Sequence, residues 1–149
     1  METYKGEQIK DLLPHRGSML LVDEMILGED NKATGVYTFK GTEWFFCGHY
    51  PDEPLVPGAI LCEIMAQVSC GLLKSPVQAK THGNPYLTNI TKAVFRKKVC
   101  PGDKLVVEIS FIQRKGPFWF VAGKAFIESE IEDEQRTLCA ESELTFYCG

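Results

Sequence analysis

This sequence lacks the features of a membrane-spanning, secreted or zinc-binding protein. It contains no run of about 18 apolar residues, so no transmembrane helix is expected. The polar stretch from Met1 to Lys10 lacks the apolar run of a signal peptide, and we therefore expect a cytoplasmic protein. The six cysteines form no Cys-x-x-Cys pair and no Cys/His spacing typical of zinc. We expect no metal site and reduced thiols that pack as small apolar side chains.

Internal repeats, low-complexity tracts and linkers are also missing, and positive charge is in slight deficit. The formal net charge of -4 gives no reason to expect nucleic acid as a partner. The hydrophobic content of 44% and the charged content of 24% are those of an ordinary globular protein, well away from disordered chains. At 149 residues the chain fits a single domain, which we expect to span residues 1–149.

The sequence contains one long helical segment. A helix is predicted over residues 57–73, because Pro57 suits the first turn and Gly71 and Pro76 mark the end. Its residues are apolar nearly all round, apart from Glu63 and Gln67. A helix of this composition must be covered by other elements, so we expect it to be buried.

The remaining elements are mostly strands. Apolar alternation, β-branched residues and turn residues predict strands over 19–27, 33–40, 86–99, 104–114, 118–130 and 135–147, with a short helix over 7–13. Consecutive strands joined by short turns imply an antiparallel sheet. Within 104–114 the residues of one face are dominantly apolar, so this face is expected to cover the long helix. The fold class is therefore α+β, with a curved antiparallel sheet around one buried helix.

An acid and a base lie close to the start of this helix. A buried carboxyl group loses its hydration unless it pairs or takes up a proton, so Glu63 is a candidate proton donor. His49, in a loop constrained by Gly48 and Pro51, is the candidate base. The alternative is that Glu63 faces solvent or an arginine and that His49 is an ordinary loop histidine. The irregular backbone around His49 favours proton-transfer chemistry.

The start of the helix is a candidate oxyanion hole. The first backbone N–H groups of a helix lack acceptors within the helix, and the helix dipole favours negative charge there. Gly58 and Ala59 occupy these positions, and a glycine lets a thioester carbonyl approach the backbone closely. The alternative, a simple Pro-Gly helix start, fits the spacing equally well.

Seven short stretches together resemble one known family. They are Leu12-Leu-Pro-His-Arg, Met19-Leu-Leu-Val-Asp, Gly48-His-Tyr-Pro, Pro54-Leu-Val-Pro-Gly, Glu63-Ile-Met-Ala-Gln, Phe95-Arg-Lys-Lys-Val and Pro101-Gly-Asp-Lys-Leu. The chain resembles the Z-type 3-hydroxyacyl-[acyl-carrier-protein] dehydratases of bacterial type II fatty acid synthesis, nearly end to end. The resemblance implies a hot-dog fold, in which a curved antiparallel sheet wraps around one long central helix.

The resemblance also implies a reaction and a set of partners. His49 would remove the C2 proton of a (3R)-3-hydroxyacyl thioester, Glu63 would protonate the departing C3 hydroxyl, and the amide of Gly58 or Ala59 would polarise the carbonyl. The product would be a trans-2-enoyl thioester, formed without a cofactor. The substrate carrier would be acyl carrier protein. In this family the histidine and the carboxylate come from opposite subunits, which implies a homodimer with shared sites, and the family often forms a trimer of dimers.

Further residues carry secondary predictions. Gln67 either orients Glu63 or caps a polar stripe at the dimer seam, and Tyr86 either gates the acyl tunnel or is structural. A basic run would attract an acidic carrier protein or would simply be a solvated strand edge; it consists of Lys92, Arg96, Lys97 and Lys98.

Other functions remain open beside dehydration in fatty acid synthesis. The glutamate at position 63, where the isomerising A-type enzymes carry aspartate, favours dehydration without isomerisation. Departures from the family pattern at Tyr50, Asp52 and Val56 leave acyl-chain length open and also allow a secondary lipid or polyketide-like pathway. A hot-dog acyl thioesterase is the main alternative. A catalytically silent acyl-binding subunit is disfavoured because His49 and Glu63 are both present.

Overall fold

The structure is a computed structural model that describes residues 2–48, 50, 52–75, 83–129, 131 and 135–148. Its strands are β1 (Glu2–Lys5), β2 (Glu24–Leu27), β3 (Lys32–Thr38), β4 (Tyr86–Phe95), β5 (Lys104–Lys115), β6 (Phe118–Ile127) and β7 (Thr137–Tyr147). Its α-helices are α1 (Ile9–Leu12) and α2 (Gly58–Leu73), and 3-10 turns cover Gly6–Gln8, Gly17–Met19 and Trp44–Phe46.

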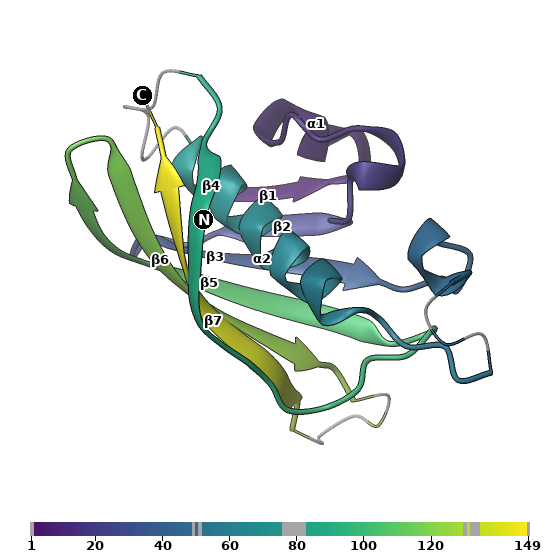
Figure 1. Cartoon of the computed structure of the whole chain (residues 1–149). Coiled ribbons are helices and arrows are strands. Elements are labelled where there is room, and N and C mark those ends of the chain that lie inside the picture. Colours follow the sequence, from purple (N-terminus) through teal and green to yellow (C-terminus); the bar gives the residue numbers. More distant parts are fainter. Residues whose placement is uncertain are drawn as a thin grey trace.

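The strands form one antiparallel sheet in the order β1-β2-β3-β5-β6-β7-β4. The sheet curves, and α2 lies across its concave face (Figure 1). Burial alternates along β3, β6 and β7, so each of these strands sends alternate side chains towards α2. The expected α+β architecture, one long helix against a curved antiparallel sheet, is confirmed.

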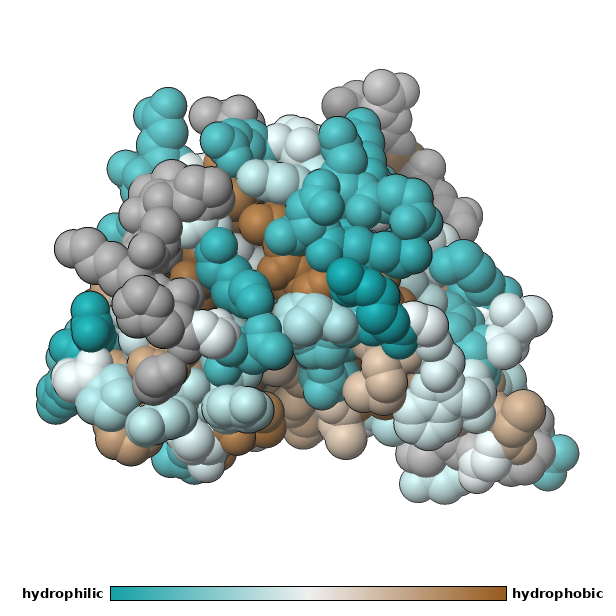
Figure 2. Space-filling view, turned by 90° about the horizontal axis from the view of Figure 1, so that it is seen from above, coloured by the Kyte–Doolittle hydropathy of each residue, from teal (hydrophilic) through white to brown (hydrophobic). Residues whose placement is uncertain are grey.

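The core lies between α2 and the sheet. Its buried apolar side chains include Leu61, Ile64, Met65, Val68 and Leu72 from α2, and Val107, Ile109, Val121, Ala125 and Leu144 from the sheet. Seen from above, hydrophilic side chains surround a hollow in which apolar side chains are visible (Figure 2). Among the described residues, no helix is long and apolar enough to span a membrane.

Glycines allow α2 to approach the sheet closely. A Cβ atom added at Gly35 of β3 would clash with the Val68 side chain, and one added at Gly71 would clash with the Met25 side chain. The predicted end of the helix at residue 73 is correct, but Gly71 does not itself end the helix: it is a packing contact in the last turn of α2. Pro76, the other predicted end signal, lies outside the described residues.

The prediction of a strand over 19–27 is correct only for its second half. Met19 ends a 3-10 turn, and β2 begins at Glu24. Leu21 and Val22 are buried, but their backbone is not part of a strand. The Leu21 N–H donates to the Gln67 side chain instead, at 2.9 Å. A side chain on the helix therefore satisfies the backbone where the sequence pattern predicted a strand.

The other boundaries differ from the prediction by a few residues. The short helix predicted over 7–13 consists of a 3-10 turn followed by α1, and β1 was not predicted. The strand predicted over 86–99 ends at Phe95, because the chain bends there so that the Arg96 and Lys97 N–H groups donate to the Cys139 carbonyl, at 2.7 and 3.3 Å. One domain over residues 1–149 stays a prediction, since it includes residues outside the described ranges.

Candidate active site

Glu63 lies at the mouth of a cavity beside α2. Its neighbours Cys62 and Ile64 are buried, whereas 30% of the Glu63 side chain is exposed, so the helix does not bury this carboxylate as fully as its sequence indicates. The cavity has a volume of about 270 Å³. Its walls, besides Glu63, include Pro14, His15, Ala66, Cys70, Tyr86, Leu87 and Phe146. The lining is mainly apolar, as a site for an acyl chain requires.

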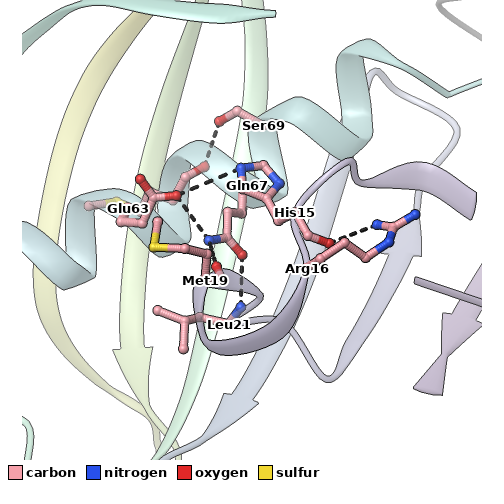
Figure 3. A network of polar contacts seen from close by, with 8 residues as sticks. His15, Arg16, Met19, Leu21, Glu63, Gln67 and Ser69 are labelled. Carbon is pink, nitrogen blue, oxygen red and sulfur yellow. Dashed lines mark hydrogen bonds and ion pairs between the residues drawn. The ribbon is translucent and has the colours of Figure 1, made fainter. Parts of the chain in front are cut away.

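Gln67 fixes one oxygen of Glu63. Gln67 is fully buried one turn along α2, and its Nε2 donates to the Met19 carbonyl at 2.6 Å and to Glu63 Oε2 at 2.9 Å (Figure 3). Its Oε1 accepts from the Leu21 N–H at 2.9 Å. The orientation of the amide is unambiguous, because a carbonyl can only accept and an N–H can only donate. Glu63 Oε2 therefore accepts a hydrogen bond from Gln67.

His15 is a site residue that the sequence analysis did not predict. Its Nε2 lies 3.8 Å from Glu63 Oε2, and its side chain is 25% exposed. Burial lowers the pKa of His15 below its usual value, although the Glu63 carboxylate acts in the opposite direction and Arg16 adds to the lowering. His15 was visible in the sequence only as part of the family-like stretch from Leu12 to Arg16. Its contact with Glu63 depends on how the segment after α1 folds back over α2.

Arg16 holds the backbone that carries His15. Its Nη1 donates to the carbonyls of Leu13 and His15 at 2.6 and 2.7 Å, and its Nη2 donates to the Lys10 carbonyl at 3.1 Å. These charge-assisted hydrogen bonds close the turn between α1 and the 3-10 turn that contains Met19. The turn is thus fixed at one end by Arg16 and at the other by Gln67.

The predicted oxyanion-hole residues do lie at the start of a helix. Gly58 is the first residue of α2. The first N–H group of the helix that donates within it is that of Ile60, which donates to the Pro57 carbonyl at 2.9 Å. Among the described residues, the N–H groups of Gly58 and Ala59 have no hydrogen-bond acceptor. A Cβ atom added at Gly58 would lie 3.0 Å from the Phe95 ring, so packing against β4 also favours a glycine here. Gly58 opens on a groove of about 400 Å³ next to Phe95.

Of two further predicted site residues, one lies outside the described part of the chain and the other lines the Glu63 cavity. His49, the predicted base, lies outside the described residues. Tyr50, next to it, has a φ of 58°, a left-handed conformation that is uncommon for a non-glycine residue. Tyr86 lines the Glu63 cavity from the start of β4 and is 66% exposed. It pairs with Tyr147 of β7, whereas the next residue, Leu87, pairs with the buried Phe146.

The basic run is largely neutralised by carboxylates. Lys92 pairs with Glu143 at 3.3 Å, Arg96 with Glu141 at 3.2 Å and Lys98 with Glu53 at 2.6 Å. Of the four cations, only Lys97 has no ion pair within the described part of the chain. Among the described residues, no group of three or more His, Cys, Asp or Glu side chains could hold a metal ion.

Comparison with known families shows which family the chain belongs to. The model of the FabA-like domain matches residues 13–132, which contain Glu63, Gln67 and His15. The chain therefore belongs to the FabA-like family. Its curated relatives include the 3-hydroxyacyl-[acyl-carrier-protein] dehydratase FabZ of Caldicellulosiruptor bescii, which is 38% identical over 140 residues, 92% of this chain and 98% of that protein. FabZ of Syntrophobacter fumaroxidans is 34% identical, over 88% of this chain and 89% of that protein.

Solved structures share the fold at lower identity. A dehydratase heterocomplex, ApeI:P from Xenorhabdus doucetiae, matches with a TM-score of 0.72 and 18% identity, over 95% of this chain and 90% of that chain. An acyl-CoA hydrolase from Staphylococcus aureus matches with a TM-score of 0.59 and 15% identity, over 80% of this chain and 66% of that chain. At these identities the matches show the fold alone. The expected hot-dog fold is confirmed.

Replacing Gln67 tests how far the site depends on this amide. Gln67→Met keeps the length of the side chain but leaves the buried Leu21 N–H without an acceptor, and it also removes the donor to the partly buried Met19 carbonyl. We expect the free energy of unfolding to fall by about 1–3 kcal/mol for each buried group left unpaired. Urea unfolding measures the loss.

Ser69→Ala is the matched control for this variant. Ser69 is also buried on α2, but its Oγ donates only to the Met65 carbonyl at 2.7 Å, which α2 keeps paired without it. We expect a change of less than about 1 kcal/mol. Equal losses for the two variants would mean that the Gln67 hydrogen bonds do not hold the segment.

Proposed function

We propose that this chain dehydrates (3R)-3-hydroxyacyl-[acyl-carrier-protein] to trans-2-enoyl-[acyl-carrier-protein] and water in fatty acid biosynthesis. The observation that carries this proposal is the Glu63 carboxyl group, held by Gln67 at the edge of a mainly apolar cavity. The curated relatives at 34–38% identity bear the name of this activity, and each is matched over most of its length. The enzyme is therefore a lyase, and more narrowly a hydro-lyase.

The proposed mechanism divides the elimination between two groups. His49 accepts the proton from C2, and the electron pair of that C–H bond forms the C2–C3 double bond. The C3–O bond breaks, and Glu63 gives its proton to the leaving hydroxyl group, which departs as water. The N–H group of Gly58 or Ala59 donates to the thioester oxygen while negative charge builds there; such a donor contributes about 10²–10³-fold in rate. No cofactor enters these steps.

The surface of β4 supports a homodimer in which two chains share each site. β4 is at the edge of the sheet, and all ten of its residues are exposed. Leu87, Ile90, Val94 and Phe95 are each at least 39% exposed, an unusual amount of apolar surface for one strand. An unpaired edge of this kind favours pairing with a second copy. Because Tyr86 and Leu87 also line the Glu63 cavity, a partner on β4 would lie next to Glu63 and could bring its own His49 there.

The carrier protein is proposed to dock at the basic run beside Gly58. Lys97 offers its charge directly, whereas Lys92, Arg96 and Lys98 would exchange their present carboxylate partners for those of the carrier. We further propose that Tyr86 gates the cavity from its exposed position. A trimer of dimers and a cytoplasmic location stay predictions.

A two-channel assay tests the reaction. The purified chain is incubated with a 3-hydroxyacyl thioester and separately with crotonyl thioester, while enoyl absorbance and free thiol are followed. We expect interconversion of hydroxyacyl and enoyl thioesters without thiol release. Glu63→Gln and His49→Ala should each lower the rate by about 10²–10⁴-fold, since each removes a proton-transfer group. Thiol release without enoyl interconversion would instead identify a thioesterase.

Mixing two inactive variants tests the shared site. His49→Ala and Glu63→Ala chains are inactive alone, and each mixed dimer has one intact site if the two groups come from different chains. Activity should then return on mixing under conditions of subunit exchange, to roughly a quarter of the wild-type rate for random equal mixing, by counting the intact sites. Labelled chains and native mass spectrometry confirm that exchange has occurred. Exchange without recovery would contradict a site built from two chains.

A further inference from the structure

We infer that His15 is a positioning residue for Glu63: Gln67 donates to Oε2 of the carboxyl group and His15 faces the same oxygen, so that Oε1 is the oxygen that delivers the proton. This inference rests on the proposed function and adds an atomic assignment to it. His15 and Gln67 approach the same oxygen from two different segments, at 3.8 and 2.9 Å (Figure 3).

The surroundings of His15 define which of its nitrogens carries the hydrogen. Nε2 faces Glu63 Oε2, which already accepts from Gln67, so the favourable arrangement has an N–H at Nε2. Nδ1 is buried and has no hydrogen-bond partner among the described residues. A second proton at Nδ1 would place an unpaired N–H and a positive charge in a buried position. The ring is therefore neutral near neutral pH, with its hydrogen on Nε2.

The charged groups around the ring agree with this assignment. Glu63 faces it from α2, and Arg16 is adjacent in the chain, and these are the two groups whose charges act on the pKa of His15. Arg16 is occupied by three backbone carbonyls. Burial lowers the pKa of His15, which keeps the ring neutral. A neutral ring places no positive charge beside the Glu63 carboxyl group.

The two oxygens of Glu63 consequently have different roles. Since Oε2 faces two N–H donors, a proton on the carboxyl group resides on Oε1. Oε1 has no hydrogen-bond partner within the described part of the chain, and it points away from His15 and Gln67 (Figure 3). As Oε1 gives its proton to the leaving hydroxyl group, negative charge develops on the carboxylate. The N–H groups at Oε2 then gain strength as charge-assisted donors.

With this geometry, His15 cannot act as the base of the reaction. The nitrogen of His15 with a free lone pair, Nδ1, is buried, and the nitrogen that faces the site carries a hydrogen. His15 thus has no lone pair to offer a substrate C–H bond. At 3.8 Å, the Nε2 contact is longer than a hydrogen bond and tightens as the carboxylate forms. The effect of His15 is accordingly expected in kcat more than in KM.

Two amide variants of the same position test the role of Nε2. Glutamine places an amide N–H near the position of Nε2, whereas asparagine places one near Nδ1. With a 3-hydroxyacyl thioester, we expect His15→Gln to keep kcat within about 3-fold of the wild-type value. His15→Asn should lower kcat by roughly tenfold or more, but by less than the about 10²–10³-fold that a direct oxyanion donor contributes. We expect KM to change by less than about 3-fold. Thermal unfolding of both variants shows whether they fold equally well.

Each result of this experiment decides the matter. If both variants kept the wild-type kcat, or if kcat fell equally in both, the positioning role of His15 would be overturned and the proposed function would still stand. Loss of activity in both variants as complete as in Glu63→Gln would make His15 a catalytic group instead. Absence of turnover by the wild-type chain would overturn the proposed function and this inference with it.

The tautomer of His15 can be measured without any activity. In two-bond ¹H–¹⁵N spectra at neutral pH, the His15 signals are identified by their disappearance in His15→Gln. We expect the pattern of a neutral ring with its hydrogen on Nε2. A charged ring, or a hydrogen on Nδ1, would contradict the inference even if the proposed function were correct.

Discussion

The buried amide of Gln67 is the interaction on which the rest of the site depends. It joins two segments that are distant in sequence, because α2 supplies the side chain and the Met19–Leu21 segment supplies a backbone acceptor and donor. A buried amide must satisfy its polar atoms, and these backbone groups determine which way it points. Its remaining N–H is then directed at Glu63. One hydrogen-bonding requirement therefore positions the proposed acid and the segment that carries His15.

Close packing makes this arrangement possible. Gly35 of β3 leaves room for the Val68 side chain of α2, and Gly71 of α2 leaves room for the Met25 side chain of β2. Most of α2 is buried against the sheet, yet Glu63 stays at the opening of a cavity between α2, the segment after α1 and β4. The carboxyl group is thus partly shielded from water and still accessible. Such a position suits a group that must donate a proton to a bound hydroxyl and recover it afterwards.

The sequence pattern predicted those features of the fold that depend on residues close together in the chain. A carboxylate in an otherwise apolar helix singled out Glu63 as the candidate acid, and strand alternation with Gly and Pro turns predicted an antiparallel sheet around that helix. The strand over Met19–Asp23 was predicted wrongly, because the hydrogen bonds of this apolar stretch go partly to Gln67 instead of a strand. The sequence pattern indicated Gly71 as a helix end, because the contact between Gly71 and Met25 that explains the glycine exists only in the folded chain. The contact of His15 was not predicted for the same reason, because tertiary structure brings its partner Glu63 close.

The central claim is that Glu63 is the acid of the dehydration and that its two oxygens have separate tasks. A crystal structure with a non-hydrolysable amide analogue of a 3-hydroxyacyl thioester tests it most directly. The account predicts that the C3 hydroxyl oxygen lies about 3 Å from Glu63 Oε1, while Oε2 still accepts from Gln67. A hydroxyl group bound at Oε2, or held away from Glu63 altogether, would contradict it.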